Sequence, residues 1–137
     1  MAGYSGTPLP KKLGIKENFL VLLLDVPAEV TAELKNTLAA CQVLKDGTGP
    51  LDFAMVCAKS SADLQKKFGK VARRLAAAGM LWIGWPKKAS GVTTDLNENE
   101  VRRIGLEEGL VDVKVCAMND TWSGLKFVIR VKDRAKL

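Results

Sequence analysis

The chain has no histidine, and this absence removes the side chain most often used for acid-base catalysis and metal binding near neutral pH. Its three cysteines, Cys41, Cys57 and Cys116, form no CxxC pair, and each lies in an apolar stretch. Without histidine they cannot complete a zinc set, so we expect no metal site. They are predicted to be buried, small hydrophobic residues in a reducing compartment.

Long hydrophobic runs are missing as well. No apolar run approaches the roughly 18 residues of a membrane span, and residues 1–12 lack the apolar core of a signal peptide. These absences predict a cytoplasmic protein with no membrane partner. Of the 137 residues, 47% are hydrophobic and 26% are charged, as in one globular domain. The net charge of +6 favours anionic partners without identifying one.

The spacing of apolar residues predicts strands that alternate with helices. Uninterrupted apolar runs at 19–24, 53–57 and 80–83 are typical of strands covered on both faces, and 42–45 could add a short strand before a turn at 46–50. Helical spacing follows Pro27 and connects the first run to the second.

Two further helices have recognisable ends. The first is predicted to begin at Ser60 as its N-cap and to end at Gly79, with Leu75 on its buried face. The second begins at Asn97, whose spacing from Glu100 resembles a capping box, and closes before a glycine at 109. Alternating residues over 111–118 and 125–131 then predict a C-terminal hairpin.

This order of elements sets the fold class and the domain boundaries. Strands joined by helices imply right-handed crossovers and an α/β fold with a mostly parallel sheet, to which the hairpin adds an antiparallel edge. Turn-forming residues before the first strand predict an N-terminal arm over 1–16. One domain over 17–132 and a tail over 133–137 complete the chain.

Several segments carry a resemblance to a known family: 5–9 (SGTPL), 11–15 (KKLGI), 81–82 (LW), 85–88 (WPKK), 94–96 (TDL), 109–116 (GLVDVKVC) and 120–127 (DTWSGLKF). Over nearly its whole length the chain resembles small bacterial proteins known only as a domain of unknown function. The C-terminal order of helix, strand and return strand is also similar to the closing half of Rossmann-type methyltransferases. The resemblance implies a shortened Rossmann-like, methyltransferase-like three-layer sandwich, and no activity.

The turn after the first strand departs from working methyltransferases. In those enzymes it is rich in glycine, which lets the backbone approach the cofactor closely. Here it is 25–29 (DVPAE), without glycine, and the stretch from Asp25 to Asp52 has room for about one βα unit where those enzymes have two. We therefore predict no cofactor, and S-adenosylmethionine should bind no more tightly than about 0.1 mM.

The main candidate site is the loop after the third strand, because open α/β sheets bind ligands beyond the carboxyl ends of their strands. It combines two cations, several hydroxyls and a nearby helix N-terminus, which suits an anion. Its candidate ligand-binding residues are Trp85, Lys87, Lys88, Ser90, Thr93, Thr94 and Asp95. The alternative is a loop stiffened by proline, with solvated lysines and with Trp85 packed on the sheet edge.

Asp25 and Ser60 each follow a buried strand, so both are expected at the same sheet edge, facing the lysine loop across a shallow cleft. Asp25 could accept a hydrogen bond from a ribose or position a lysine; equally, both residues could cap their helices. Trp122 and Ser123 are predicted near the hairpin turn, where the tryptophan could stack on a ligand ring or pack over the end of the sheet.

A basic stripe is predicted opposite the apolar face of the helix that follows Ser60. Its residues are Lys66, Lys67, Lys70, Arg73 and Arg74. Such a stripe could track the phosphates of a nucleic acid, or it could be an ordinary solvated face.

Three functional hypotheses follow. The main one is a binding or interaction module for a small anionic ligand at the Lys87-Lys88 loop. The first alternative is an enzyme at the same cleft, either a reduced S-adenosylmethionine-dependent methyltransferase or a hydrolase using Asp25, Ser60 or Ser90 with a loop lysine. The second alternative is a weak nucleic-acid binder. No nucleophile motif selects a reaction, so catalytic residues and oligomeric state are left open.

Overall fold

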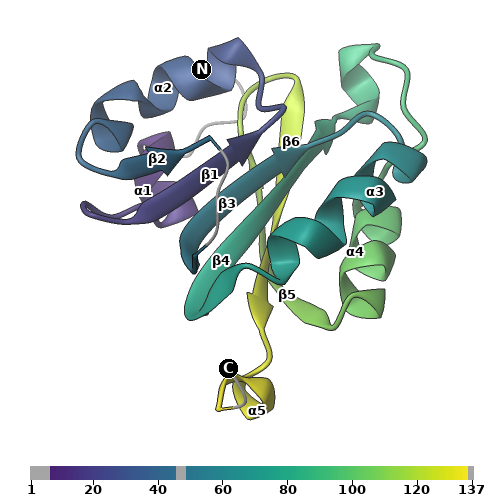
Figure 1. Ribbon diagram of the computed structural model, residues 1–137. Coiled ribbons are helices and arrows are strands. Elements are labelled where there is room, and N and C mark those ends of the chain that lie inside the picture. Colours follow the sequence, from purple (N-terminus) through teal and green to yellow (C-terminus); the bar gives the residue numbers. More distant parts are fainter. Residues whose placement is uncertain (1–6, 46–48, 136–137) are drawn as a thin grey trace.

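The computed structural model describes residues 7–45 and 49–135; the expectations for 1–6, for 46–48 in the turn and for 136–137 lie outside it. Six strands form one sheet with helices on both faces (Figure 1). The strands are β1 (Leu20–Leu24), β2 (Gln42–Leu44), β3 (Leu51–Cys57), β4 (Leu75–Pro86), β5 (Leu110–Ala117) and β6 (Trp122–Ile129). The helices are α1 (Leu9–Leu13), α2 (Ala28–Leu38), α3 (Ser61–Ala72), α4 (Glu98–Glu107) and α5 (Val131–Arg134), with a 3₁₀ turn at Lys88–Ser90.

The strand order is β2-β1-β3-β4-β6-β5, and this confirms the predicted fold class. Strands β2, β1, β3 and β4 run parallel, and β6 is antiparallel to both β4 and β5. The predicted hairpin is present, but its return strand inserts next to β4 and leaves β5 at the edge. Only α2 and β2 separate β1 from β3. The stretch between these strands therefore holds about one βα unit, as the sequence predicted, where working methyltransferases have two.

Two hydrophobic clusters hold the layers together, one on each face of the sheet. On one face, α3 and α4 pack against β4 and β6, and Phe68 meets Phe127 edge to face with ring centroids 5.3 Å apart. On the other, α1 and α2 cover β1 and β3. The indole N–H of Trp82 donates to the carbonyl of Leu13 at 2.9 Å and so ties α1 to the sheet. Helix α1 was not predicted, because its five residues are too few to reveal a helical period.

Helix α3 ends before the residue predicted to close it. Its last residue is Ala72, and the predicted stop, Gly79, lies inside β4 together with Leu75. A Cβ at Gly79 would lie 2.4 Å from the carbonyl oxygen of Leu51. The glycine therefore allows β4 to approach β3 closely and does not terminate a helix.

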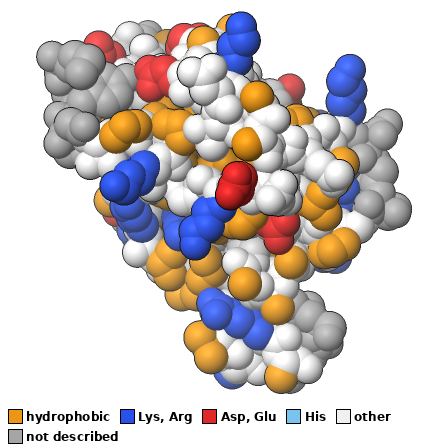
Figure 2. Space-filling model, turned by 90° about the vertical axis from the view of Figure 1, so that its left-hand side faces the viewer, with side chains coloured by type: hydrophobic (Ala, Val, Ile, Leu, Met, Phe, Trp, Pro, Cys, Tyr) orange, Lys and Arg blue, Asp and Glu red, His pale blue; other side chains and the backbone are white. Residues whose placement is uncertain are grey.

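Strand β2 forms the opposite edge of the sheet from β5 and has only three residues. Val43 in this strand is 45% exposed. On the side of the molecule that carries β2, hydrophobic side chains lie at the surface between lysines, arginines and acidic residues (Figure 2). No further strand pairs with this edge among the described residues.

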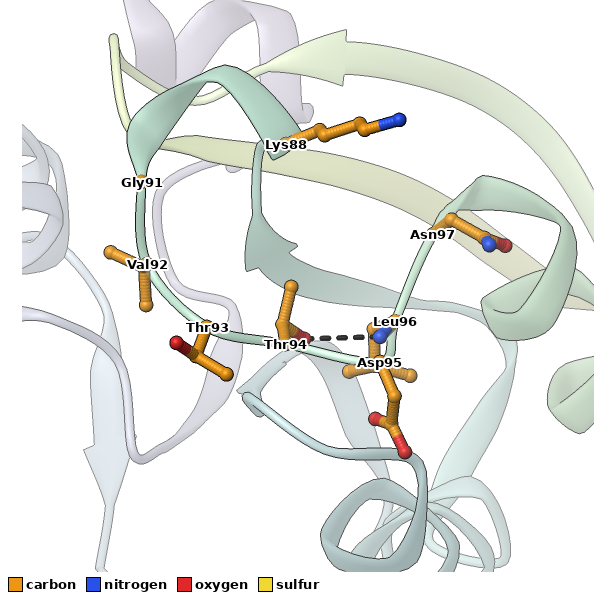
Figure 3. Close-up of a pocket in the computed structure, with 8 residues that line it drawn as sticks. All are labelled: Lys88, Gly91, Val92, Thr93, Thr94, Asp95, Leu96 and Asn97. Atoms are coloured by element: carbon orange, nitrogen blue, oxygen red, sulfur yellow. Dashed lines mark hydrogen bonds between the residues drawn. The ribbon is translucent and has the colours of Figure 1, made fainter.

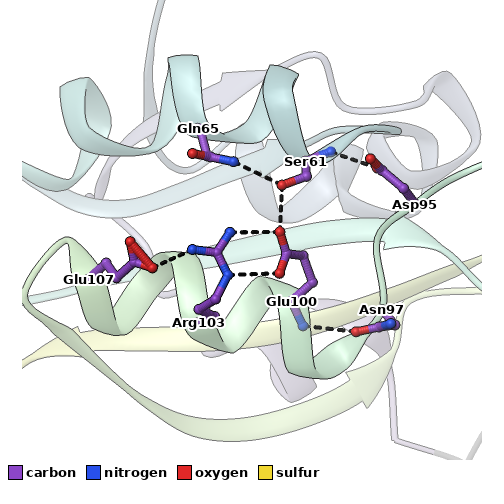
Figure 4. A network of polar contacts seen from close by, with 7 residues as sticks. All are labelled: Ser61, Gln65, Asp95, Asn97, Glu100, Arg103 and Glu107. Atoms are coloured by element: carbon purple, nitrogen blue, oxygen red, sulfur yellow. Dashed lines mark hydrogen bonds and ion pairs between the residues drawn. The ribbon is translucent and has the colours of Figure 1, made fainter.

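A polar network joins α3 to α4 (Figure 4). The Glu100 carboxylate accepts hydrogen bonds from the Ser61 hydroxyl at 2.6 Å and from the Arg103 guanidinium at 2.7 and 2.8 Å. Asn97 caps α4 as predicted, by accepting from the Glu100 N–H at 2.8 Å. The Glu100 side chain turns to α3 and does not complete a capping box. Arg103, and after it Ser61, lower the pKa of Glu100 to about 2.

The first prediction concerns Gly105, where α4 crosses β6. A Cβ at this position would lie 2.0 Å from the Phe127 ring, so Gly105→Ala should lower the free energy of unfolding by about 1 to 3 kcal/mol. Gly69→Ala is the matched control in α3: the atoms nearest to its Cβ would belong to the flexible side chains of Arg73 and Glu108, at 3.0 Å. It should be neutral or stabilise by up to about 1 kcal/mol, since alanine favours helix. Equal effects in urea denaturation would contradict this packing.

The second prediction concerns pH. Because the folded-state pKa of Glu100 is lowered from 4.5 to about 2, its contribution to stability is complete above pH 4.5 and is lost as the pH falls toward 2. The wild-type chain should lose unfolding free energy as the pH falls from 4.5 toward 2, and Glu100→Gln should lose less of it. Urea denaturation at several pH values measures this. Glu17→Gln, at an exposed position outside this network, is the control for the loss of a surface charge and should change the slope less than Glu100→Gln does. An unchanged slope in Glu100→Gln would refute the assignment.

Candidate active site

The chain order reverses between β1 and β3, which are parallel neighbours in the centre of the sheet. From β1 the chain passes through α2 to β2 on one side, whereas β3 leads through α3 to β4 on the other. Such a reversal leaves a crevice outside the carboxyl ends of the two strands. A cavity of about 380 Å³ lies there, lined by Asp25, Cys57, Ala58, Lys59, Asp63, Lys67 and Trp122. We call it the central cleft, and its volume is that of a small-ligand site.

Asp25 forms the turn that leads from β1 into this cleft. Its φ is 57°, in the left-handed region that glycine favours and aspartate tolerates. The turn therefore takes a left-handed conformation without glycine. Pro27 is the N-cap of α2 and no side chain caps this helix, so the alternative that Asp25 caps it is wrong. Asp25 instead forms an ion pair with Lys67.

Lys67 reaches from α3 into the cleft. Its ammonium also pairs with Asp63 at 2.6 Å and donates to the Cys57 carbonyl at 3.3 Å. Burial lowers the pKa of Lys67, but its hydrogen bonds to Asp25 and Asp63 outweigh this and raise the pKa above its ordinary value. The Lys67 side chain is only 17% exposed, so its predicted place on a solvated basic stripe is wrong.

Cys57 ends β3 and lies at the floor of the cleft, with 1% of its surface exposed. Burial raises the pKa of its thiol to about 12, against an opposing effect of Lys67. The thiol is therefore protonated near neutral pH and is a poor nucleophile. Cys41 and Cys116 are free and only half-buried, so the expectation that all cysteines are buried holds for Cys57 alone.

The predicted lysine loop surrounds a second cavity, of about 480 Å³, lined by Lys88 and by residues 91–97 (Figure 3). Two of the loop's hydroxyls, those of Ser90 and Thr94, are engaged in hydrogen bonds within the protein. The Ser90 hydroxyl donates to the Lys87 carbonyl at 2.6 Å, and the Thr94 hydroxyl donates to the Lys59 carbonyl at 2.6 Å. The Asp95 carboxylate points away from Lys88 and accepts from the Ser61 N–H at 2.8 Å.

The remaining predicted site residues fall into four environments. Trp85 is 5% exposed and packs in the cluster under α3 and α4, and Ser123 is its partner in β6. Ser60 is the N-cap of α3 and accepts from the Asp63 N–H at 3.1 Å. Trp122 is 6% exposed and lines the central cleft. Thr93 lines the second cavity.

The structure thus brings Asp25 and Trp122 together, and it separates them from Lys88 and Thr93. The hydrogen bond from Thr94 to Lys59 joins the walls of the two cavities, because each residue lines one of them. Sequence reasoning missed Cys57, Asp63 and the role of Lys67. The four-residue spacing of Asp63 and Lys67 was the available signal, since such pairs lie on one helix face.

Within residues 7–45 and 49–135, no group of three or more acidic or cysteine side chains is arranged to hold a metal ion. In the same part of the chain, no helix has the length and hydropathy needed to cross a bilayer.

No family model and no curated protein matches the chain. Solved structures do. An S-adenosylmethionine-dependent methyltransferase from Aquifex aeolicus is 18% identical, with a TM-score of 0.59 over 88% of this chain and 87% of its own. A type 11 methyltransferase, so described provisionally, from Sulfolobus solfataricus is 15% identical, with a TM-score of 0.59 over 96% and 95%.

A third similar structure is the magnesium protoporphyrin IX methyltransferase of Synechocystis with bound SAH: 9% identity and a TM-score of 0.58 over 89% of this chain and 78% of that one. The fold is methyltransferase-like. The main hypothesis from the sequence was an anion-binding module of unknown activity, and this comparison contradicts it. The similar solved structures are S-adenosylmethionine-dependent methyltransferases, which favours the enzyme alternative.

The third prediction follows from the burial of Cys57. In a chain carrying Cys41→Ser and Cys116→Ser, native Cys57 should react with a disulfide reagent at pH 8 at least about a hundredfold more slowly than after denaturation. Its raised pKa leaves little thiolate, and its burial blocks access. Cys57→Ala, which keeps the two half-buried thiols, is the control. Its labelling rates in the native and denatured states should differ less. Fast native labelling of Cys57 would show that the cleft floor is open.

Proposed function

We propose that this chain is an enzyme of methyltransferase type, reduced by one βα unit, that binds S-adenosylmethionine in the central cleft. The observation that carries the proposal is the cavity at the point where the strand order reverses. Open α/β sheets bind their ligands at this point. We further propose that the chain belongs with the small bacterial proteins that it resembles, and that it acts in the cytoplasm, which its free cysteines support.

The residues of the cleft fit the charged end of S-adenosylmethionine. Its sulfonium and ammonium groups are cations, and Asp25 and Asp63 present carboxylates within one cavity. Trp122 adds an aromatic wall on which part of a ring could rest. When bound, S-adenosylmethionine would supply a methyl group to a nucleophile of an acceptor. Cys57 is unsuited to be that nucleophile, because its thiol stays protonated.

The turn after β1 limits the affinity. Asp25 carries a side chain where glycine would let the backbone approach a ligand, and Pro27 has no N–H to donate. We therefore expect saturable binding with a dissociation constant weaker than about 0.1 mM.

The nucleic-acid alternative has less support. Its basic stripe loses Lys67, whose charge is engaged by Asp25 and Asp63. The exposed members, Lys66, Lys70 and Arg73, offer charge on an outer face and line none of the cavities described above. Such a surface gives salt-sensitive attraction with little selectivity.

The fourth prediction is that, in a chain carrying Lys67→Met, Asp25→Asn weakens S-adenosylmethionine binding by about threefold to tenfold, because it removes a carboxylate that would face the ligand's cation and that no longer pairs with the Lys67 ammonium. Titration calorimetry up to about 5 mM ligand measures the change. Asp120→Asn is the matched control: Asp120 is exposed in the β5–β6 turn at the same edge of the sheet and does not line the cleft. The proposal fails if the wild-type chain shows no saturable binding, or if both variants weaken it equally.

A further inference from the structure

The Lys67 ammonium lies where the loops after β1 and β3 meet. Three acceptors surround it: the carboxylates of Asp25 and Asp63 and the carbonyl of Cys57. An ammonium has three N–H donors, so this arrangement can satisfy all of them. Asp25 follows β1, Cys57 ends β3 and Asp63 lies in the first turn of α3. One cation supplied by the chain therefore bridges three elements at the ligand-binding edge of the sheet.

The charged residues that line the cleft balance one another, although the chain as a whole is basic. Asp25 and Asp63 contribute two negative charges. Lys59 and Lys67 contribute two positive ones. The chain as a whole carries +6. With the Lys67 ammonium removed from the cleft, two carboxylates would face one lysine, and the net negative charge of the lining would attract a cation.

We propose that Lys67 determines the ligand specificity of the central cleft: its ammonium takes the position of a ligand's cationic group between Asp25 and Asp63, and a cationic ligand binds by displacing it. The inference rests on the proposed function and names the part of the ligand that is recognised, the sulfonium. The demethylated product has a neutral thioether at that position. A cleft with Lys67 displaced therefore distinguishes S-adenosylmethionine from its product by charge.

Displacement is physically accessible because Lys67 has a long, flexible side chain with 17% of its surface already exposed. The lysine can turn outward toward solvent without unfolding α3, whose buried face is formed by other residues, Leu64, Phe68 and Val71 among them. If Lys67 leaves the two carboxylates for about a tenth of the time, the apparent affinity of the cleft for a cationic ligand is about tenfold below its intrinsic affinity.

The test compares wild type with Lys67→Met, which keeps most of the side-chain volume and removes the charge. Lys66→Met is the matched control, because Lys66 is exposed on the same helix and lies outside the cleft. Lys67→Met should bind S-adenosylmethionine about tenfold more tightly than wild type, with the affinity for the product changed less than about threefold. Lys66→Met should match wild type in both. Circular dichroism checks that each variant folds. If Lys67→Met does not fold, Lys67→Gln replaces it.

A second arm uses probes that do not depend on the identity of the ligand. Trimethylsulfonium chloride is titrated into the wild-type chain while the ε-methylene resonances of Lys67 are followed by NMR, with tert-butanol as the neutral probe of similar shape. The Lys67 resonances should move toward those of exposed Lys66 with the cation and should stay in place with the alcohol. Sodium chloride at equal ionic strength controls for screening.

The outcomes separate the two proposals. If trimethylsulfonium displaces Lys67 but neither chain binds S-adenosylmethionine, the proposed function fails and the role of Lys67 stands. If S-adenosylmethionine binds wild type and the Lys67 variant equally, or binds the variant more weakly, Lys67 is a structural or ligand-holding residue and this inference is wrong. Lys67 resonances that do not respond to the sulfonium overturn it as well, with no variant required.

Discussion

The central strands β3 and β4 are buried on both faces, and this burial excludes charged side chains from most of their length. In β3 all residues except Asp52 are buried, and in β4 the run from Leu81 to Pro86 is buried without interruption. No polar or charged residue is buried as a whole among the described residues, although two guanidinium nitrogens of Arg74 are. Since an unpaired charge in such a core is costly, the ionisable groups close to β1, β3 and β4 lie at the ends of these strands or on the helices beside them. The groups of the candidate site accordingly lie at the carboxyl edge of the sheet.

At that edge two kinds of polar group are present, and they have different roles. The Ser90 and Thr94 hydroxyls and the Asp95 carboxylate of the 87–97 loop form hydrogen bonds that fold the loop and attach it to Lys59 and to the start of α3. The groups of the central cleft also pair with each other, but Asp25 and Asp63 keep 57% and 43% of their side-chain surface exposed. Pairing in the loop uses atoms that a ligand would need, whereas the carboxylates of the cleft retain open faces. This difference, and not the number of lysines, distinguishes a candidate site from a structural loop.

Much of the fold could be predicted from local patterns, because long apolar runs and helix caps are local signals. Ser60 and Asn97 cap the helices that the sequence assigns to them. Gly79 was misassigned because its role, a close approach to Leu51, depends on a residue nearly thirty positions away. Lys67 was misassigned for a similar reason. Helical periodicity places a residue on a face of its own helix, but it does not show that Asp25, from another element, will meet that face.

In our proposal, the missing βα unit makes charge the main basis of ligand recognition in the central cleft. A further strand beside β2 would cover an edge that is now three residues long and carries a half-exposed Val43. Without that strand and its loop, one wall of the ligand site in a longer sheet is absent, so less of a ligand's surface can be removed from water. Apolar burial contributes about 25 cal/mol per Å², and a cleft that loses a wall loses this contribution in proportion. Ion pairs act at the mouth of an open cleft, where enclosure is incomplete, and they are weakened there by solvent and salt. A shortened methyltransferase-like sheet is thus expected to enclose a ligand less and to select it more by charge, and in our proposal the two carboxylates around Lys67 provide that selectivity.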